Sequence, residues 1–330
     1  MGVSQRRFGR TGWTTSSIGL GAWAIGGSWG EVSEAEGKAT LHAALDAGVS
    51  FLDTADVYGD GRSERLIRDV LAERGGDRPI VATKAGQRFD PHVAEAYAGP
   101  GLEAFIDRSL ANLGVETLDL LQLHCPPTGV FYMPEVFGLL DDLVGKGKLR
   151  HYGVSVEKVE EGLKAMTFPN VVSVQIIYNM FRQRPEELFL PQARERDVAV
   201  IVRVPLASGL LTGKMTAAST FAADDHRSFN RHGEAFDVGE TFAGVPFEVA
   251  LEAVERLRPL VPGGASMAQF ALRWILMNEA VSVVIPGARR PEQAVANAAA
   301  DALDPLPAET MDEVRRIYGE MIGPHVHQRW

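Results

Sequence analysis

Four ionisable side chains within the first 124 residues could together move a proton. Asp53 closes the apolar run VSFLD and Tyr58 follows in the next segment, while Lys84 and His124 each close another apolar run. A tyrosine has an ordinary pKa of about 10, and a neighbouring ammonium favours the phenolate and lowers that value. An aspartate would orient the lysine, and a histidine could position a carbonyl oxygen or relay a proton. The set therefore suits a general acid that protonates a developing alkoxide.

Three of these residues also have a simpler interpretation. Asp53 could cap a loop, Lys84 could be a solvated residue, and His124 could be a satisfied, half-buried histidine. Proton transfer requires a fold that brings the ends of these separate apolar runs together.

Eight short apolar runs recur along the chain, with amphipathic segments between them. Their near-continuous hydrophobicity is typical of parallel strands that helices cover. The runs span residues 16–22, 49–55, 79–85, 118–124, 151–156, 171–177, 198–204 and 281–287.

The segments between the runs carry the helical period. Residues 101–115 and 267–278 each place apolar side chains on one face, and Gly114 and Gly145 stand where helices are expected to end. The alternation predicts an α/β fold, a (β/α)8 TIM barrel in a single domain over residues 1–330.

Additional segments are expected around this barrel. A hairpin is predicted at 6–19, and an extra helix near 247–258 follows an irregular insert at 205–245. A long irregular insert on a barrel is usually a functional loop. Because the carboxyl ends of barrel strands form the active face, the four ionisable residues are expected at one rim.

The composition excludes several classes of function. The formal charge is −10, which disfavours binding driven by nucleic-acid phosphates. No apolar stretch approaches the roughly 18 residues of a membrane span, and the first twelve residues lack the apolar core of a signal peptide. One cysteine, Cys125, allows no intrachain disulfide. We therefore expect a cytoplasmic protein with a small-molecule substrate, without nucleic-acid or membrane partners, and leave a homo-oligomer open.

Seven motifs occur in an order and spacing that resemble one family. They are FLDTADVYG, VATKAG, LDLLQLHCP, YGVS, VQIIYN, GLLTGK and VIPGARRPEQAVAN. The chain resembles the aldo-keto reductase superfamily over almost its full length. That resemblance implies a barrel that binds NADP(H) without a Rossmann domain and reduces an aldehyde or ketone to an alcohol. It also implies that Asp53, Tyr58, Lys84 and His124 form the catalytic tetrad, with Tyr58 as the general acid.

The resemblance further implies a set of cofactor-binding residues, from the nicotinamide end to the adenosine end. They are Gly21, Ala22, Trp23, Asp53, Ser155, Gln175, Arg203, Pro205, Leu206, Ser208, Gly209, Leu210, Lys214, Gly287, Arg289, Gln293 and Asn297. The sequence PGARRPEQ runs from a strand into a helix start with two arginines, which suits an anion. Arg289 reaching a 2′-phosphate would favour NADP over NAD.

The chain departs from the family pattern at three positions. Val156 and Ala296 replace an Asn and a Glu that are common in relatives, so a carboxamide contact and an adenine contact of those relatives are not expected here. Arg203 stands where many relatives stack an aromatic ring on the nicotinamide. It could form a salt bridge with a rim carboxylate, or it could lie against the nicotinamide and disfavour the positively charged oxidised ring.

Aromatic residues in the expected rim loops could line a substrate pocket or belong to the core. They are Trp23, Trp29, Phe89, Tyr97, Phe131 and Tyr132. Cys125 adjoins His124, but strand neighbours point to opposite sides, so a Cys–His nucleophile is not expected. No metal site is expected, because the histidines at 325 and 327 have no accompanying ligand cluster.

Two alternative functions fit the same fold. Some relatives keep the cofactor and serve a membrane-protein partner, so a non-catalytic regulatory subunit is one alternative. A glycoside hydrolase could pair Asp53 with Asp56. That function is disfavoured because an aspartate beside a lysine stays ionised and is a poor acid.

Overall fold

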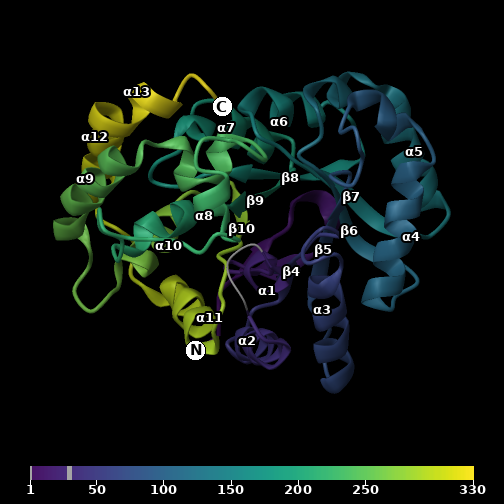
Figure 1. Cartoon of the computed structure of the whole chain (residues 1–330), viewed down its shortest axis with the longest axis horizontal. Coiled ribbons are helices and arrows are strands. Elements are labelled where there is room, and N and C mark those ends of the chain that lie inside the picture. The colour runs from purple at the N-terminus through teal and green to yellow at the C-terminus, as the bar shows by residue number, and fades with distance from the viewer. Residues whose placement is uncertain (1, 28–31) are drawn as a thin grey trace.

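Eight parallel strands form one sheet in this computed structural model, which describes residues 2–27 and 32–330 (Figure 1). The strands are β3 (Leu20–Gly21), β4 (Phe51–Asp53), β5 (Ile80–Ala85), β6 (Leu118–His124), β7 (Leu149–Ser155), β8 (Val171–Ile177), β9 (Ala199–Arg203) and β10 (Val281–Val284). They pair in chain order, and the parallel bridges Ile18–Val284 and Gly21–Gly287 join the two edges. The sheet therefore closes into the predicted barrel.

A helix precedes each following strand, and a further helix follows β10 (Figure 1). These helices are α2 (Glu34–Asp46), α3 (Arg62–Glu73), α4 (Gly101–Leu113), α5 (Pro134–Gly145), α6 (Val159–Ala165), α7 (Phe189–Glu195), α10 (Met267–Leu276) and α11 (Pro291–Ala298). α4 ends as predicted at Gly114, whose φ of 65° is left-handed. α5 ends at Gly145, but the left-handed glycine after it is Gly147, with φ 77°.

The remaining elements decorate the barrel. The predicted hairpin pairs β1 (Gln5–Arg7) with β2 (Thr14–Ser16), and the predicted extra helix is α9 (Phe247–Leu257). The other α-helices are α1 (Trp23–Gly26), α8 (His226–Phe229), α12 (Ala308–Ile317) and α13 (Gly323–Val326). The short 3-10 and π turns are η1 (Gly9–Thr11), η2 (Ala94–Ala98), η3 (Thr128–Tyr132), η4 (Arg184–Glu186), η5 (Ala207–Thr212), η6 (Val238–Glu240), η7 (Phe242–Gly244), η8 (Arg258–Leu260), η9 (Ala299–Ala302) and η10 (Tyr318–Ile322).

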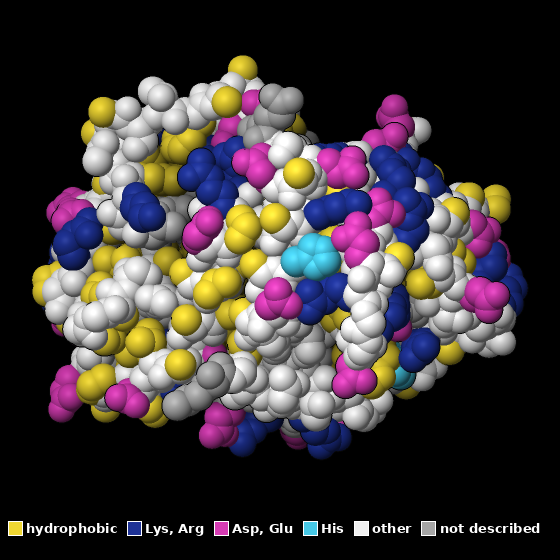
Figure 2. All heavy atoms as spheres, turned by 90° about the horizontal axis from the view of Figure 1, so that it is seen from below, with side chains coloured by type: hydrophobic (Ala, Val, Ile, Leu, Met, Phe, Trp, Pro, Cys, Tyr) yellow, Lys and Arg dark blue, Asp and Glu magenta, His cyan; other side chains and the backbone are white. Residues whose placement is uncertain are grey.

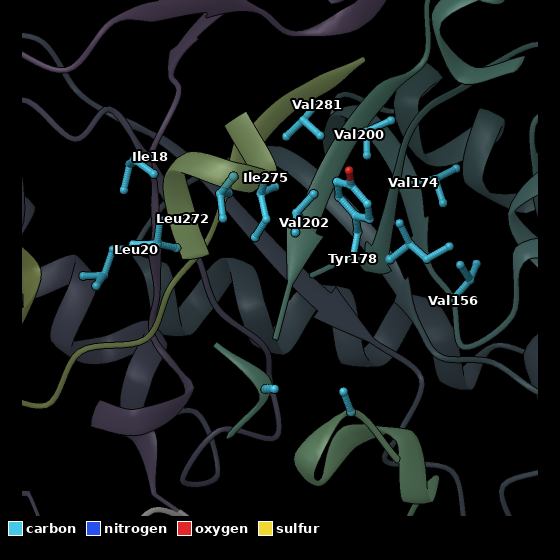
Figure 3. Packing of buried hydrophobic residues seen from close by; sticks show 14 of the residues in the cluster. Ile18, Leu20, Val156, Val174, Tyr178, Val200, Val202, Leu272, Ile275 and Val281 are labelled. Atoms are coloured by element: carbon cyan, nitrogen blue, oxygen red, sulfur yellow. The ribbon is translucent and has the colours of Figure 1, made fainter. Parts of the chain in front are cut away.

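The hydrophobic core has an outer and an inner layer. Strand residues such as Val174 and Val202 pack outward with helix residues such as Leu272 and Ile275 (Figure 3). A smaller cluster inside the barrel includes Phe8 of the hairpin, whose ring centroid lies 5.3 Å from that of Phe51. The hairpin thus closes the amino-terminal end of the barrel interior, and the carboxyl end remains for polar side chains.

Strand β6 shows how this division arises from the period of two along a strand. Leu121 and Leu123 belong to the outer core, while Leu120 belongs to the inner cluster. Gln122 and His124 therefore follow Leu120 up the inside of the barrel, and every residue of the strand is buried. The interior changes from apolar to polar toward the carboxyl end, where the predicted chemistry lies.

The surface carries charges of both signs. On the face shown in Figure 2, Lys and Arg side chains lie interspersed with Asp and Glu. Among the described residues, no helix is both long enough and apolar enough to cross a membrane.

Candidate active site

The structure brings Asp53, Tyr58, Lys84 and His124 together at the carboxyl end of the barrel. Asp53 and His124 are the last residues of β4 and β6, and Lys84 is the penultimate residue of β5. Lys84 pairs in register with Gln122 of the neighbouring strand β6. Gln122 stands two residues before His124, on the same face of that strand. Tyr58 comes from the loop before α3, and its ring lies 5.9 Å from that of His124 at 82°.

An ion pair directs the Lys84 ammonium toward the phenol. Lys84 Nζ donates to Asp53 Oδ1 at 2.5 Å, to Thr54 O at 2.8 Å and to Tyr58 Oη at 3.4 Å. Asp53 and Lys84 are almost fully buried. A buried charge pair is stable only when hydrogen bonds satisfy its remaining donors and acceptors, so the donation to Tyr58 is part of a fixed arrangement.

Two glutamines complete the environment of Asp53. Gln175 Nε2 donates to Asp53 Oδ2 at 2.7 Å and Gln122 Nε2 donates to the same oxygen at 3.0 Å. Gln175 was predicted as a cofactor residue, and its Oε1 lies 3.5 Å from Ser155 Oγ. Gln122 was not predicted from the sequence. Its signal is a lone amide in an apolar strand, two residues before His124 and therefore on the same face.

The protonation states differ in one respect from the sequence expectation. Desolvation, followed by the negative charge of Asp53, raises the pKa of Tyr58 well above its ordinary value, whereas the sequence predicted that Lys84 would lower it. The physical reason is that burial disfavours the charged phenolate and that Asp53 offsets the lysine charge. Burial, with the positive charges of Lys84 and Arg203, lowers the pKa of His124 well below 6.5. At neutral pH the site therefore holds a protonated phenol and a neutral imidazole.

Arg203 forms the second charged cluster at this rim. Its Nη2 donates to Glu157 Oε2 at 3.1 Å and to Val156 O at 2.8 Å, and its Nη1 pairs with Glu240. The structure thus shows the salt-bridge alternative for Arg203. Repulsion of an oxidised nicotinamide would need an uncompensated cation, and the two carboxylates offset its charge. Neither glutamate was identified from the sequence.

Cys125 lies beside this cluster, which corrects its predicted orientation. Its φ of 45° ends the alternation of β6, and its Sγ lies 3.5 Å from Ser155 Oγ. The thiol and the carboxylates of Glu157 and Glu240 lie within 4.8 Å of one another. Burial raises the pKa of the thiol, so it stays protonated and is a poor nucleophile. A cation among these groups would have to compete with Arg203.

The predicted nicotinamide-end residues lie around the tetrad. Ala22 N donates to Asp53 O at 2.8 Å, and the Trp23 ring lies 6.0 Å from the Tyr58 ring at 19°. Ser155 is buried at the end of β7, and Gly21 forms the barrel-closing bridge. The predicted nicotinamide-end residues thus lie at the carboxyl ends of β3, β4 and β7.

The predicted pyrophosphate segment follows β9 and has an unusual backbone. Ala207 and Ser208 have φ of 46° and 54°, and Gly209 has φ of 97°. Left-handed conformations at residues other than glycine cost energy and cluster at functional sites. The other predicted residues of this segment differ in exposure: Pro205 and Leu210 are buried, Leu206 is half-buried and Lys214 is exposed.

The predicted adenosine end lies at the start of α11. Gln293 Oε1 accepts from the backbone N–H groups of Arg289 at 2.9 Å and Arg290 at 3.2 Å, and Asn297 Nδ2 donates to Gly287 O at 3.3 Å. Gly287 is exposed, and a Cβ there would meet nothing nearer than 3.9 Å. An open glycine followed by two arginines and a helix N-terminus forms a surface suited to a phosphate.

The six predicted pocket aromatics do not share one environment. Trp23 contacts Tyr58, and Trp29 lies outside the described residues. Phe89 packs on the buried Tyr97 with ring centroids 4.9 Å apart. Phe131 lies in the hydrophobic core, and Tyr132 is 68% exposed beneath Lys164. The structure gives no support to a pocket role for these last two.

The insert supplies aromatic contacts that the sequence analysis did not identify. His226 and Phe236 lie 4.8 Å and 6.2 Å from the Trp23 ring, measured between ring centroids. The insert at 205–245, predicted as a functional loop, therefore contacts Trp23, whose ring lies beside Tyr58.

The chain is similar to known proteins over nearly its full length. The model of the "Aldo/keto reductase family" matches residues 17–319. "Aldo-keto reductase YhdN" from Bacillus subtilis is 34% identical over 86% of this chain and 84% of that protein. A "Probable voltage-gated potassium channel subunit beta" from Oryza sativa is 30% identical over 96% of this chain and 95% of that protein.

A solved structure confirms the fold. The glycerol dehydrogenase AKR11B4 from Gluconobacter oxydans superposes with a TM-score of 0.77 at 30% identity, over 99% of this chain and 97% of that chain. The superposed residues include the barrel, the insert at 205–245 and the helices that follow α11.

Proposed function

Because the chain belongs to the aldo/keto reductase family, we propose that it reduces an aldehyde or ketone to an alcohol with NADP(H). The observation that carries the proposal is the hydrogen-bonded series Asp53–Lys84–Tyr58 beside a neutral His124. A phenol next to a fixed ammonium is a proton donor whose conjugate base is stabilised in advance.

The residues around the predicted cofactor site fit this group. The open surface at Gly287, the two arginines before α11 and the left-handed segment after β9 are features suited to a dinucleotide with an extra phosphate. Bound there, the cofactor supplies the hydride from carbon 4 of its nicotinamide. We propose that Arg289 contacts the 2′-phosphate and that Ser155 and Gln175 contact the carboxamide.

The chain's own residues then handle the proton and the carbonyl oxygen. Neutral His124 donates a hydrogen bond that orients the carbonyl. Tyr58 donates its proton as charge develops on that oxygen, and Lys84 stabilises the resulting phenolate. Asp53 holds the Lys84 ammonium in the orientation that points it at Tyr58. The raised pKa of Tyr58 keeps the phenol protonated before each turnover.

Two alternatives receive different support. Asp53 accepts from Lys84, Gln122 and Gln175, so both of its oxygens are already occupied and neither is placed to donate a proton in glycoside hydrolysis. A regulatory subunit is supported by the similarity to the channel subunit. It would bind the cofactor but would not need a working proton donor.

Turnover separates the reductase from the regulatory subunit. We would follow NADPH consumption with a panel of short aldehydes and ketones, using the wild type and Tyr58→Phe. A reductase turns over and the variant does not, while both bind NADPH in a fluorescence titration. Equal, negligible consumption by both proteins, with cofactor binding intact, would favour the regulatory subunit.

A further inference from the structure

Trp330, the last residue of the sequence, is buried against the insert. Its side chain is only 4% exposed, although Gln328 and Arg329 before it are exposed. Its Nε1 donates to Asp237 Oδ1 at 2.8 Å, and the Arg182 guanidinium lies 4.0 Å from its ring centroid. A buried indole with a satisfied N–H and a cation on its face is held in one orientation.

The insert is shaped to receive this ring. A Cβ on Gly239 would lie 3.0 Å from Trp330 Cε2, and a Cβ on Gly244 would lie 2.5 Å from Cη2. Gly244 also has a left-handed φ of 78°. Arg182 Nη1, beneath the ring, donates to Ala243 O at 3.2 Å. The two glycines thus provide the close approach that any larger residue would block.

The same stretch of the insert reaches the reacting centre. Asp237, the acceptor of the indole N–H, also accepts from Gly239 N at 2.7 Å. The next residue, Glu240, pairs with Arg203 at the end of β9. The charges of Glu240 and Arg203 both act on the Tyr58 phenol. One continuous set of contacts therefore connects the tail to the rim where the tetrad lies.

We propose that Trp330 is a positioning residue, whose indole holds segment 237–244 in the place where Glu240 pairs with Arg203. Without the indole, the segment loses the hydrogen bond to Asp237 and the ring between its two glycines. Arg203 would then keep Glu157 alone. The kinetic consequence of this loss rests on the proposed reductase function. The packing of Trp330 on segment 237–244 is independent of that function.

Hydrogen–deuterium exchange of the full chain tests the packing without any assay of activity. We expect the amides of 237–244 to exchange about tenfold faster or more in Trp330→Ala. Gln328→Ala, an exposed neighbour in the same tail, should match the wild type. The amides of α4 serve as an internal reference, because that helix lies away from the tail.

The outcomes of this experiment decide the inference. Unchanged exchange at 237–244 in Trp330→Ala would overturn it. Equal acceleration in α4 would overturn it as well, because Trp330 would then be a general stability residue. If Trp330→Ala does not fold, Trp330→Phe decides. The phenyl ring keeps the contacts but lacks the indole donor, so faster exchange confined to 237–244 supports the inference and wild-type exchange refutes it.

Steady-state kinetics test the consequence for the site. Trp330→Ala should raise the Kd of NADPH about tenfold and lower kcat less than about threefold. Segment 237–244 also holds Ser208, a predicted pyrophosphate residue whose Oγ donates to Glu240 O at 3.0 Å, whereas the ion pair of Asp53 and Lys84 beside Tyr58 lies on the barrel strands. Combining Trp330→Ala with Glu240→Gln should add little to the larger single effect. A loss confined to kcat, or fully additive effects, would contradict the inference. A wild type without turnover would count against the reductase function alone.

Discussion

Two buried cations lie at the same rim, and their partners differ. Lys84 has one carboxylate, Asp53, whose second oxygen accepts from two glutamine amides. Arg203 lies between two carboxylates, Glu157 and Glu240, and also donates to a backbone carbonyl. We call the first group the lysine cluster and the second group the arginine cluster.

This difference in partners indicates that the two clusters have different roles. All members of the lysine cluster come from barrel strands or the short loop after β4, and one ammonium donor remains for Tyr58. The arginine cluster joins β9 to the loop after β7 and to the insert. A cation with one carboxylate partner can still act on a reacting atom. A cation enclosed by two partners holds loops in place.

The largest effect should come from the lysine cluster. Tyr58→Phe removes the proton donor and leaves the ring, so kcat for carbonyl reduction should fall about 10²–10⁴-fold, the usual contribution of a general acid. NADPH affinity, measured by fluorescence titration, should stay near that of the wild type. Turnover close to normal would show that another group donates the proton and would remove the distinction between the clusters.

Disrupting the arginine cluster should lower the free energy of unfolding more than it lowers kcat. Arg203→Met leaves Glu157 and Glu240 without their cation, and breaking a buried pair in this way costs about 3–5 kcal/mol of unfolding free energy. Urea unfolding at pH 8 measures this cost. It should shrink at lower pH. Burial and the charge of Glu157 raise the pKa of Glu240 against the opposing charge of Arg203, so removing Arg203 raises that pKa further and the carboxylate takes up a proton.

Arg316→Met is the matched control for this substitution. Arg316 pairs with two carboxylates as well, Glu313 and Glu320, but on the exposed surface. Exposed ion pairs contribute little, so this variant should unfold near the wild-type midpoint. If the two variants lost equal stability, burial of the arginine cluster would not be the cause.

The two clusters also differ in how far the sequence could predict them. Asp53, Lys84 and His124 were predictable because barrel strands end at one rim, whatever the details of packing. Gln122 could have been found from the period of two within β6. Glu240 could not, because the insert has no repeating pattern that fixes where a side chain points.

Two errors have the same kind of cause. The predicted orientation of Cys125 assumed regular strand geometry, and its positive φ breaks that geometry. The predicted direction of the Tyr58 pKa shift considered Lys84 but not desolvation or the neutralising Asp53. The types and spacing of residues indicate which groups come together. Irregular backbone conformations determine where their side chains point, and burial determines their pKa values.

A third prediction concerns Arg289, which lies just before α11 at the adenosine end of the predicted cofactor site. Arg289→Ala should weaken NADPH binding by about 1.5–3 kcal/mol, the contribution of a charge-assisted hydrogen bond, and should affect NADH much less. Titration of both cofactors measures the two losses. Arg290→Ala, on the more exposed neighbour, is the comparison variant. Equal losses for the two cofactors would show that Arg289 does not contact the 2′-phosphate.

The smallest expected effect concerns Asp56. It lies three residues after Asp53 of the lysine cluster, but its cationic partner is Arg88. Asp56 is fully buried, and its Oδ2 lies 3.2 Å from Arg88 Nε. Burial raises its pKa to about 7, against the opposing charge of Arg88. The folded state therefore binds this proton more tightly than the unfolded state does. Stability from this group is present below about pH 4 and is lost as the pH rises to about 7.

Asp56→Asn cannot titrate, so the decline in unfolding free energy between pH 5 and pH 8 should shrink by about 1 kcal/mol or more relative to the wild type. Asp60→Asn is a control of opposite sign. Asp60 is exposed, pairs with Arg88 and Arg108, and has a lowered pKa, so its contribution is present at neutral pH and is lost only in acid. Urea unfolding across this pH range measures all three proteins. If Asp56→Asn kept the full wild-type decline, Arg88 would be holding Asp56 ionised throughout this pH range. Partner geometry would then matter more than the type of cation in deciding which buried carboxylates at this rim take up a proton.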